Sequence, residues 1–325
     1  MRIIVTGAAG FIGRRVVRRL VDRGDEVVGI VRDPSRVRDL SGVALIAGDL
    51  SSVAGLRDQF TGADAVIHLA GIYRVGIPAN ERPAMLDANV GATQRVIDAA
   101  VEAGVTRIVY VSTVNAFGNT RGQVVDETYQ RDVAKGFVSY YDETKYLAHE
   151  AASERIRGGA PIVIVQPGTV YGPNDNSAIG IQLEQAFRGT LPFRSVDGLG
   201  VTPVHVEDVA AGIVAALDRG RIGESYVLAG PNIRQGEALA IAARAGGHRL
   251  PRLRVPARVL RLVAPLASRM PPALTARLGL PPNVNEAVSA TDGVSYWGSS
   301  AKAERELGFV SRPLDVGVRD AFGTG

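Results

Sequence analysis

Short runs rich in Val and Ile alternate with helix-length segments through the first half of this 325-residue chain. Such runs suit strands that are buried on both faces, and parallel neighbours need a crossover between them, usually a helix. The alternation therefore predicts an α/β fold, a doubly wound parallel sheet with helices on both faces. The expected strands are Arg2–Thr6, Glu26–Val31, Val43–Ala47, Ala65–Leu69, Arg107–Ser112 and Ile162–Gln166, and the expected helices are Phe11–Asp22, Val53–Phe60, Pro83–Ala103 and Ser139–Ile156.

A glycine-rich turn, Thr6-Gly7-Ala8-Ala9-Gly10-Phe11-Ile12-Gly13, joins the first predicted strand to the first predicted helix. In such a turn Gly7 permits the sharp bend, Gly10 lets the backbone approach a pyrophosphate, and Gly13 lets helix and strand pack closely. The positive end of the helix dipole favours the negative charge. The turn predicts a Rossmann dinucleotide-binding domain, with cofactor contacts from Gly7, Ala9, Gly10, Phe11 and Ile12.

The regular alternation ends after Tyr171. A loop-rich insertion is expected at Gly172–Val204, followed by a helix at Glu207–Leu217 and a last strand at Ser225–Leu228. Beyond Gly230 the chain is rich in Pro and Arg and shows no second alternation of strands and helices. We therefore predict a Rossmann domain from residues 1–171 and 205–230, and a smaller C-terminal substrate-binding lobe from residues 172–204 and 231–325.

Two arginines follow the second predicted strand, in Val31-Arg32-Asp33-Pro34-Ser35-Arg36. A guanidinium suits the 2′-phosphate of NADP(H), because it is a permanent charge and a bidentate donor. An acidic residue at this place would instead bind the ribose hydroxyls of NAD(H), and Asp33 keeps that alternative open. We predict NADP(H) in preference to NAD(H), bound through Arg32 and Arg36.

Further cofactor contacts are expected where the third and fourth strands end. Asp49 would lie beside the adenine pocket, although the same stretch is equally suited to cap the helix that begins near Ser51. After the fourth strand the small residues allow a close approach of the backbone to the cofactor, and His68 is expected to be packed rather than catalytic. The expected contacts are Asp49 and Leu50 after the third strand, and Leu69, Ala70 and Gly71 after the fourth.

Candidate catalytic groups come from the fifth strand and the helix after it. Tyr141 and Lys145 lie one helical turn apart, so both side chains project from one face. Thr113 stands at the end of the fifth strand, the edge where open α/β sheets bind ligands. An adjacent ammonium and the positive charge of the cofactor should lower the pKa of the phenol, so that it exchanges a proton near neutrality. Thr113 would hydrogen-bond the substrate oxygen and Lys145 would orient the nicotinamide ribose, which predicts hydride chemistry between a carbonyl and an alcohol.

Composition excludes several other classes of chemistry. The chain has no Cys and only four His, so neither thiolate catalysis nor a metal site is expected. Its net charge of +4 comes from Arg residues spread along the whole chain, and nucleic acid is therefore not an expected partner. We find no signal-peptide pattern at Met1-Arg2-Ile3 and no uncharged run of membrane-spanning length. We expect a cytoplasmic protein whose partner is a small-molecule substrate.

Motifs along nearly the whole chain resemble those of the extended short-chain dehydrogenases/reductases, the NAD-dependent epimerase/dehydratase superfamily. They include the segments above and three further ones: Asp87-Ala88-Asn89-Val90-Gly91-Ala92-Thr93, Gln166-Pro167-Gly168-Thr169-Val170-Tyr171-Gly172-Pro173 and Val204-His205-Val206-Glu207-Asp208. Ser300-Ala301-Lys302-Ala303-Glu304-Arg305-Glu306-Leu307-Gly308-Phe309 extends the match toward the end of the chain. Within this superfamily the chain is similar to the branch of dihydroflavonol reductase-like and hopanoid-associated sugar-epimerase-like proteins.

The resemblance implies a Ser/Thr–Tyr–Lys triad, here Thr113, Tyr141 and Lys145. It also implies that Asn89 is a supporting structural or proton-relay position, that Asn89, Pro167 and Thr169 line the cofactor site with Tyr141 and Lys145, and that the protein is a homodimer through the helices at Pro83–Ala103 and Ser139–Ile156. Gln166 departs from the pattern, because many relatives carry a basic residue before the Pro, and this departure argues against a nucleotide-sugar substrate. Glu207 and Asp208 are interpreted as helix-capping and ion-pairing residues rather than a catalytic dyad.

Residues 248–280 carry many Arg and no Asp or Glu among abundant Leu, Val and Pro. We interpret this segment as helices that close over the pocket. The alternative is an amphipathic segment on a membrane surface, but membrane association is not expected.

The leading expectation is an NADP(H)-dependent ketoreductase or alcohol dehydrogenase acting on a hydrophobic small molecule. The alternatives are an NAD(P)-dependent nucleotide-sugar epimerase or dehydratase with internal hydride return, and a non-catalytic NADP(H)-binding protein. Aromatic candidates for the pocket are Tyr73, Phe117, Tyr171, Tyr296 and Trp297.

Overall fold

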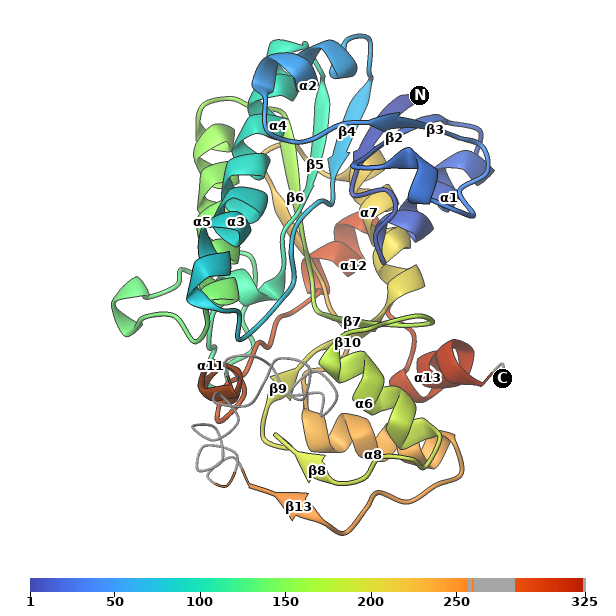
Figure 1. Cartoon of the computed structure of the whole chain (residues 1–325), viewed down its shortest axis with the longest axis vertical. Coiled ribbons are helices and arrows are strands. Elements are labelled where there is room, and N and C mark those ends of the chain that lie inside the picture. Colours follow the sequence, from blue (N-terminus) through green and yellow to red (C-terminus); the bar gives the residue numbers. More distant parts are fainter. Residues whose placement is uncertain (257–258, 260–283, 324–325) are drawn as a thin grey trace.

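The structure is a computed structural model, and it describes residues 1–256, 259 and 284–323. Its larger part is built on a seven-stranded sheet with the order β11-β6-β5-β4-β1-β2-β3, in which every neighbouring pair is parallel (Figure 1). The strand order reverses between β1 and β4, so the loops that follow these two strands lie side by side at the carboxyl edge. The strands are β1 (Arg2–Thr6), β2 (Glu26–Val31), β3 (Val43–Ala47), β4 (Ala65–His68), β5 (Arg107–Val111), β6 (Ile162–Pro167) and β11 (Ser225–Leu228).

Helices cover both faces of this sheet, as predicted (Figure 1). Along β1, Ile3 and Val5 pack toward one helical layer and Ile4 toward the other. Successive residues are therefore all buried, which explains why the strand sequences are continuous runs of Val and Ile. One layer contains α1 (Gly13–Asp22) and α7 (Val206–Arg219), and the other contains α2 (Val53–Phe60), α4 (Ala92–Glu102) and α5 (Tyr140–Arg157).

The helix predicted at Pro83–Ala103 is not continuous. It is divided into α3 (Arg82–Leu86), a π-helical turn η3 (Asp87–Gly91) and α4. A π turn adds one residue to the helical turn and changes which side chains face inward. Asn89 lies in this turn, and its side chain is buried. The apolar periodicity of the segment is uninterrupted, so it did not predict the π turn.

A smaller lobe lies below the carboxyl edge of the sheet (Figure 1). Its core joins Leu183, Leu239 and Val318, which come from three helices. The insertion expected to be loop-rich at Gly172–Val204 contains one of them, α6, because Ser177 caps its start by accepting a hydrogen bond of 3.0 Å from the Gly180 N–H. The helices are α6 (Ala178–Phe187), α8 (Gln235–Ala245) and α13 (Leu314–Phe322), and the paired short strands are β7 (Thr169–Tyr171) with β10 (Pro203–His205), β9 (Gly200–Val201) with β12 (Ile233–Arg234), and β8 (Arg194–Ser195) with β13 (Arg254–Val255).

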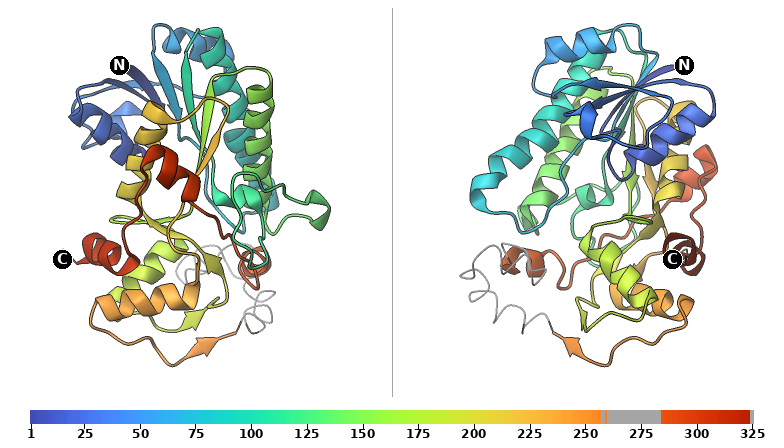
Figure 2. Two further views of the ribbon diagram at one scale, coloured as in Figure 1. Left: turned by 180° about the vertical axis from the view of Figure 1, so that it is seen from behind. Right: turned by 45° about the vertical axis from the view of Figure 1, so that its right-hand side comes forward.

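The assignment of all of residues 231–325 to the lobe is wrong at one place. The helix α12 (Ala301–Leu307) contacts α7 and β11, as the view from behind in Figure 2 makes clear. Ala303, Leu307 and Phe309 belong to the same apolar core as α1 and α7. A helix this short has too little periodicity to reveal its packing partner from the sequence. The remaining domain boundaries stay predictions.

Most of the predicted pocket-covering segment at 248–280 lies outside the described residues. The chain is described again from α11 (Val284–Ser289) onward. No helix in the described part of the chain is long and apolar enough to cross a membrane.

Candidate active site

The loop after β1 has the shape of a dinucleotide cradle. Gly7 adopts a φ of +73°, and a Cβ there would lie 2.7 Å from the Ala70 nitrogen. A Cβ on Gly13 would lie 2.1 Å from the Gly7 carbonyl oxygen, so neither position accepts a side chain. The helix α1 begins with no side-chain cap and no acidic residue in its first turn. The N–H groups of Arg14, Arg15 and Val16 are bonded to the Gly10 and Ile12 carbonyls, so the turn and the start of the helix form one rigid unit. The positive end of the helix dipole is not neutralised by a carboxylate, and these residues fit a bound pyrophosphate.

In the loop after β2, the Asp33 carboxylate is bound by residues of the same loop. Asp33 accepts hydrogen bonds from the Ser35 N–H at 3.1 Å and the Ser35 hydroxyl at 2.6 Å, and it pairs with the Arg36 guanidinium at 3.0 Å. Arg32 is exposed, and among the described residues no hydrogen bond or ion pair engages it. The charge at the end of β2 that is free to meet a ligand is therefore positive.

In the loop after β3, the structure decides one of the two interpretations of Asp49, namely whether it caps the next helix. Asp49 accepts hydrogen bonds from the Ser51 hydroxyl at 2.5 Å and the Ser51 N–H at 3.3 Å. These bonds hold the pKa of the exposed Asp49 carboxyl below its usual range. The cap of α2 is Ser52, which accepts from the Gly55 N–H at 3.3 Å, so Asp49 turns the loop without capping the helix. Contacts of Asp49 and Leu50 with adenine stay predictions.

His68, at the end of β4, is a packed residue. Its Nδ1 lies 2.7 Å from the Thr6 hydroxyl and its Nε2 lies 3.1 Å from the Thr93 hydroxyl. Burial, with a smaller effect of the Lys145 charge, lowers the pKa of His68 to about 3. The ring is neutral at ordinary pH and joins β4, β1 and α4.

Asn89 connects the loop after β4 to α5. Its Oδ1 accepts a hydrogen bond of 2.7 Å from the Ile72 N–H, and its Nδ2 donates to the Ile72 carbonyl at 3.1 Å and to the Thr144 hydroxyl at 3.0 Å. The Thr144 hydroxyl in turn donates to the Tyr141 carbonyl at 3.0 Å. Leu69, Ala70 and Gly71 immediately precede this anchor. These bonds fit the supporting structural role that the resemblance implied for Asn89.

Two hydroxyls follow β5 and point to different partners. The Ser112 Oγ lies 3.1 Å from Nδ1 of His149 on α5. Thr113 is the N-cap of the short helix η4 (Val114–Phe117), and its hydroxyl accepts from the Asn115 N–H at 3.3 Å. The same hydroxyl lies 3.1 Å from Asn115 Oδ1 and 3.5 Å from the Pro167 carbonyl. Thr113, rather than Ser112, is thus the hydroxyl held between the ends of β5 and β6.

The chain after β6 passes close to the lobe at Gly168. A Cβ at Gly168 would lie 2.5 Å from the Thr202 carbonyl oxygen. Thr169 donates its N–H to that carbonyl at 2.9 Å, and its hydroxyl accepts from the Thr202 N–H at 3.3 Å. These contacts place Pro167 beside Thr113 and use both polar groups of Thr169 to join β7 to the lobe. Cofactor contacts of Pro167 and Thr169 stay predictions.

Tyr141 is buried in the first turn of α5. Its ring meets the ring of Tyr73 edge-on, with 4.9 Å between the centroids, and packs with Ile77 and Met85. Burial, more than the neighbouring phenols, raises the pKa of Tyr141 well above its ordinary value. For the protein without its cofactor this reverses the direction predicted from the sequence, because loss of water around the phenol is the dominant effect. Tyr141 is therefore protonated at neutral pH.

Lys145 lies on the same face of α5, one turn deeper. Its Nζ is 5.6 Å from the centroid of the Tyr110 ring on β5. Burial lowers the pKa of Lys145 to about 8. Its charge also helps to lower the pKa values of His68, at the end of β4, and of His149 on α5. Tyr141 and Lys145 thus lie on α5, which contacts η4, and Thr113 is the N-cap of η4.

The predicted aromatic set divides into pocket and core residues. Tyr73 is half exposed beside Tyr141, and the buried Tyr296 lies near Asn115, two residues after Thr113. Tyr171 instead faces His205 in the core of the lobe, with 5.5 Å between the ring centroids. Trp297 donates its indole N–H to the Ile233 carbonyl at 3.2 Å, which makes it a structural residue, and Phe117 packs on Tyr129 with 5.9 Å between centroids.

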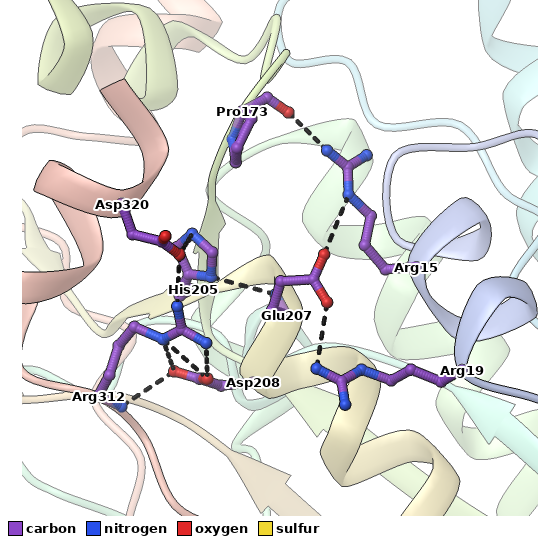
Figure 3. Close-up of polar contacts among 8 residues, drawn as sticks. All are labelled: Arg15, Arg19, Pro173, His205, Glu207, Asp208, Arg312 and Asp320. Carbon is purple, nitrogen blue, oxygen red and sulfur yellow. Dashed lines mark hydrogen bonds and ion pairs between the residues drawn. The ribbon is translucent and has the colours of Figure 1, made fainter. Parts of the chain in front are cut away.

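Glu207 and Asp208 form separate ion pairs at the start of α7 (Figure 3). The Glu207 carboxylate lies 3.1 Å from Arg19 and 3.8 Å from Arg15, both on α1. Asp208 accepts bonds of 2.6 to 3.0 Å from the guanidinium of Arg312, next to α13. The two carboxylates point to different partners and connect α7 to both parts of the molecule, which agrees with their interpretation as ion-pairing residues. Neither caps the helix, because the N-cap of α7 is His205, whose Nδ1 accepts from the Glu207 N–H at 3.3 Å.

Comparisons with known proteins agree with this geometry. The profile of the NAD dependent epimerase/dehydratase family matches residues 3–229. Sterol demethylase protein B of Methylococcus capsulatus is 30% identical over 99% of this chain and 97% of its own length. A 4-hydroxy-2-methyl-3-oxo-4-farnesyl-3,4-dihydroquinoline-1-oxide ketoreductase of Stigmatella aurantiaca is 32% identical over 70% of this chain and 68% of its own length.

Solved structures extend the likeness to the whole chain. The crystal structure of gox2253 is 33% identical, with a TM-score of 0.81 and coverage of 99% of this chain and 96% of that one. MoeE5 in complex with UDP-glucuronic acid and NAD is 26% identical, with a TM-score of 0.76 and coverage of 99% of this chain and 98% of that one. This chain belongs to the NAD-dependent epimerase/dehydratase family, and it is an NAD(P)-dependent enzyme of the extended short-chain dehydrogenase/reductase type.

Proposed function

We propose that this enzyme is an NADP(H)-dependent reductase of a hydrophobic carbonyl compound, with Tyr141 as the proton donor. The observation that carries the proposal is a protonated phenol buried among aromatic and apolar side chains at the carboxyl edge of the sheet. A carbonyl reductase needs the protonated form, because the developing alkoxide takes its proton from the enzyme. A dinucleotide held by its pyrophosphate at the cradle after β1 would supply the hydride from its nicotinamide.

Three residues of the chain share the remaining work. Tyr141 holds the proton at its phenolic oxygen and gives it to the substrate oxygen. The Thr113 hydroxyl, which donates to Asn115 Oδ1 in the structure, would turn its proton to the same substrate oxygen as negative charge develops there. Lys145, with a pKa of about 8, keeps its charge at neutral pH and would bind the nicotinamide ribose. Ser112 takes no part in this set, because it is directed at His149.

The NADP(H) preference rests on the loop after β2. Arg32 has no partner among the described residues, whereas Asp33 is held by Ser35 and Arg36 and is poorly placed to accept ribose hydroxyls. A 2′-phosphate would meet two guanidinium groups, Arg32 and Arg36, in this loop.

The proposal of a hydrophobic substrate rests on the surroundings of Tyr141. Tyr73, Ile77, Met85 and Tyr296 provide aromatic and aliphatic surface there. Two relatives support it through their names, which refer to a sterol and to a farnesylated quinoline oxide. The second candidate, a nucleotide-sugar epimerase or dehydratase with internal hydride return, is supported by the likeness to MoeE5 bound to a nucleotide sugar.

Titration with NADPH and with NADH, followed by nicotinamide fluorescence, tests the cofactor assignment. Arg32→Ala should weaken NADPH binding by about tenfold or more, since a charged hydrogen bond to phosphate is lost. NADH binding should not change. Arg18→Ala removes the same charge from an exposed position on α1 and serves as the control. Equal or tighter binding of NADH by the wild type would overturn the assignment.

Turnover of NADPH with lipophilic ketones tests the reaction class. Net oxidation of NADPH with alcohol formation is the expected result. Conversion of a nucleotide sugar without net change in cofactor would select the epimerase or dehydratase instead.

A further inference from the structure

A buried ion pair lies immediately beyond Tyr141. The side chain of Asp142, in the first turn of α5, is 0% exposed, and that of Arg131 is 6% exposed. Arg131 donates two hydrogen bonds to the Asp142 carboxylate, from Nη1 to Oδ1 at 2.9 Å and from Nη2 to Oδ2 at 2.6 Å. The Val138 N–H donates to the same carboxylate at 3.2 Å. A bidentate pair of this kind fixes both distance and orientation.

The guanidinium of Arg131 turns inward from a loop that is otherwise exposed at residues 132–137. Its Cζ lies 4.4 Å from the centroid of the Phe137 ring and 5.4 Å from that of Tyr146. A Cβ built on Gly118, which has a φ of +71°, would lie 2.6 Å from this Cζ. The guanidinium therefore touches the backbone where η4 ends.

This position joins the two elements that carry the proposed catalytic hydroxyls. Thr113 caps the start of η4, and Tyr141 immediately precedes Asp142 in α5. The two helices are in direct contact. Arg131 touches the end of one and is bonded to the first turn of the other, so it fixes the separation of the Thr113 and Tyr141 hydroxyls.

The pair also sets the charge beside the phenol. After burial and the neighbouring phenols, the Asp142 carboxylate contributes to the raised pKa of Tyr141, and Arg131 opposes Asp142 at the neighbouring Tyr296. Among the described residues, the other titratable groups around Tyr141 are Tyr73 from the loop after β4, Tyr110 from β5, Tyr296 from the segment before α12, and Lys145 one turn along α5. Glu286 of α11 accepts a hydrogen bond of 2.7 Å from the N–H of the preceding residue, Tyr140, and pairs with Arg82 at 3.5 Å.

We propose that Arg131 and Asp142 are a positioning pair for Tyr141, which holds the phenol against Thr113 and keeps the charge beside it balanced. The inference rests on the proposed reductase function. Neither residue touches the reacting atoms. Each acts through Tyr141. Removing the charge of Arg131 and removing the charge of Asp142 should therefore shift the pKa of Tyr141 in opposite directions.

The test is the pH dependence of NADPH-driven ketone reduction. Activity should fall in two steps as the pH rises: first near pH 8, where Lys145 loses its charge, and again at higher pH, where Tyr141 becomes a phenolate with no proton to give. The second step is the falling limb that reports Tyr141. Arg131→Gln leaves an uncompensated carboxylate, which disfavours the phenolate, so the falling limb should move up by about one pH unit. Asp142→Asn leaves an uncompensated guanidinium and should move it down by about one unit. The double variant Arg131→Gln/Asp142→Asn should return the limb toward the wild-type position.

A second bidentate pair on the same helix provides the control. Arg155 is bonded to Asp98 on α4 at 2.6 and 2.7 Å, in the last turns of α5 and away from Tyr141. Asp98→Asn should leave the pH profile in place. If Arg131→Gln does not fold, the nearly isosteric Asp142→Asn decides alone through its downward shift.

Losses of activity with an unmoved limb, or shifts of the same sign in both variants, would overturn the inference while leaving the reductase assignment intact. A wild-type protein that binds NADPH but reduces no ketone would overturn the proposed function and this inference with it.

Discussion

Asn89→Ala offers a quantitative test of how the site is held together. The side chain makes three hydrogen bonds, two to the backbone of Ile72 and one to Thr144. Asn89 is 2% exposed, so water does not readily replace the lost partners. At about 1 kcal/mol for each hydrogen bond, the free energy of unfolding should fall by about 3 kcal/mol. The loop that contains Ala70 and Gly71 loses its anchor, and NADPH binding should weaken by about tenfold.

Urea unfolding and NADPH titration of the same preparation measure both effects. The midpoint should fall with little change in the slope of the transition, since the surface exposed on unfolding is the same. Asn232→Ala is a matched control, because Asn232 also bridges both backbone groups of one residue, Gly298, at 3.1 and 2.9 Å. It should cost about 2 kcal/mol and leave NADPH affinity unchanged. A loss below about 1 kcal/mol for Asn89→Ala, or equal weakening of NADPH binding in both variants, would refute the reasoning.

Three further predictions follow from the site. Tyr141→Phe should lower kcat for ketone reduction by about 100-fold or more while NADPH still binds, because only the proton donor is removed; stopped-flow and fluorescence titration check this, and retained turnover would contradict it. Gly13→Ala should abolish stabilisation by NADPH in thermal melts, because its Cβ would lie 2.1 Å from the Gly7 carbonyl oxygen. Burial lowers the pKa of His68 to about 3 and that of His149 to about 4, so the unfolded chain binds more protons between these values and about 6.5. Stability should therefore be complete above pH 6.5 and decline as the pH falls toward 4, and His149→Gln should make this decline, measured by urea midpoints, shallower.

The sequence determined the large α/β unit almost to the residue. The predicted bounds of β1 and β2 match those of the structure, because the interior of each strand is an apolar run that is buried on both faces. The need for glycine at Gly7 and Gly13 was also predictable, because a side chain at either position would clash within the turn or with the backbone after the neighbouring strand. The spacing of Tyr141 and Lys145 placed both on one helix, which is α5 in the structure, and the joint role of these two residues with Thr113 stays a prediction.

Only the tertiary structure decided how these groups are tuned. The raised pKa of Tyr141 comes from its burial and, to a smaller extent, from the charges of Tyr73, Tyr110 and Tyr296, which lie far from it in the sequence. The π turn that directs Asn89 inward, and the inward turn of Arg131 from an exposed loop, have no periodic signature. Sequence patterns record which faces are apolar, a local property of the chain. Desolvation and ion pairing depend on distances between segments that become neighbours only when the sheet and the lobe have formed.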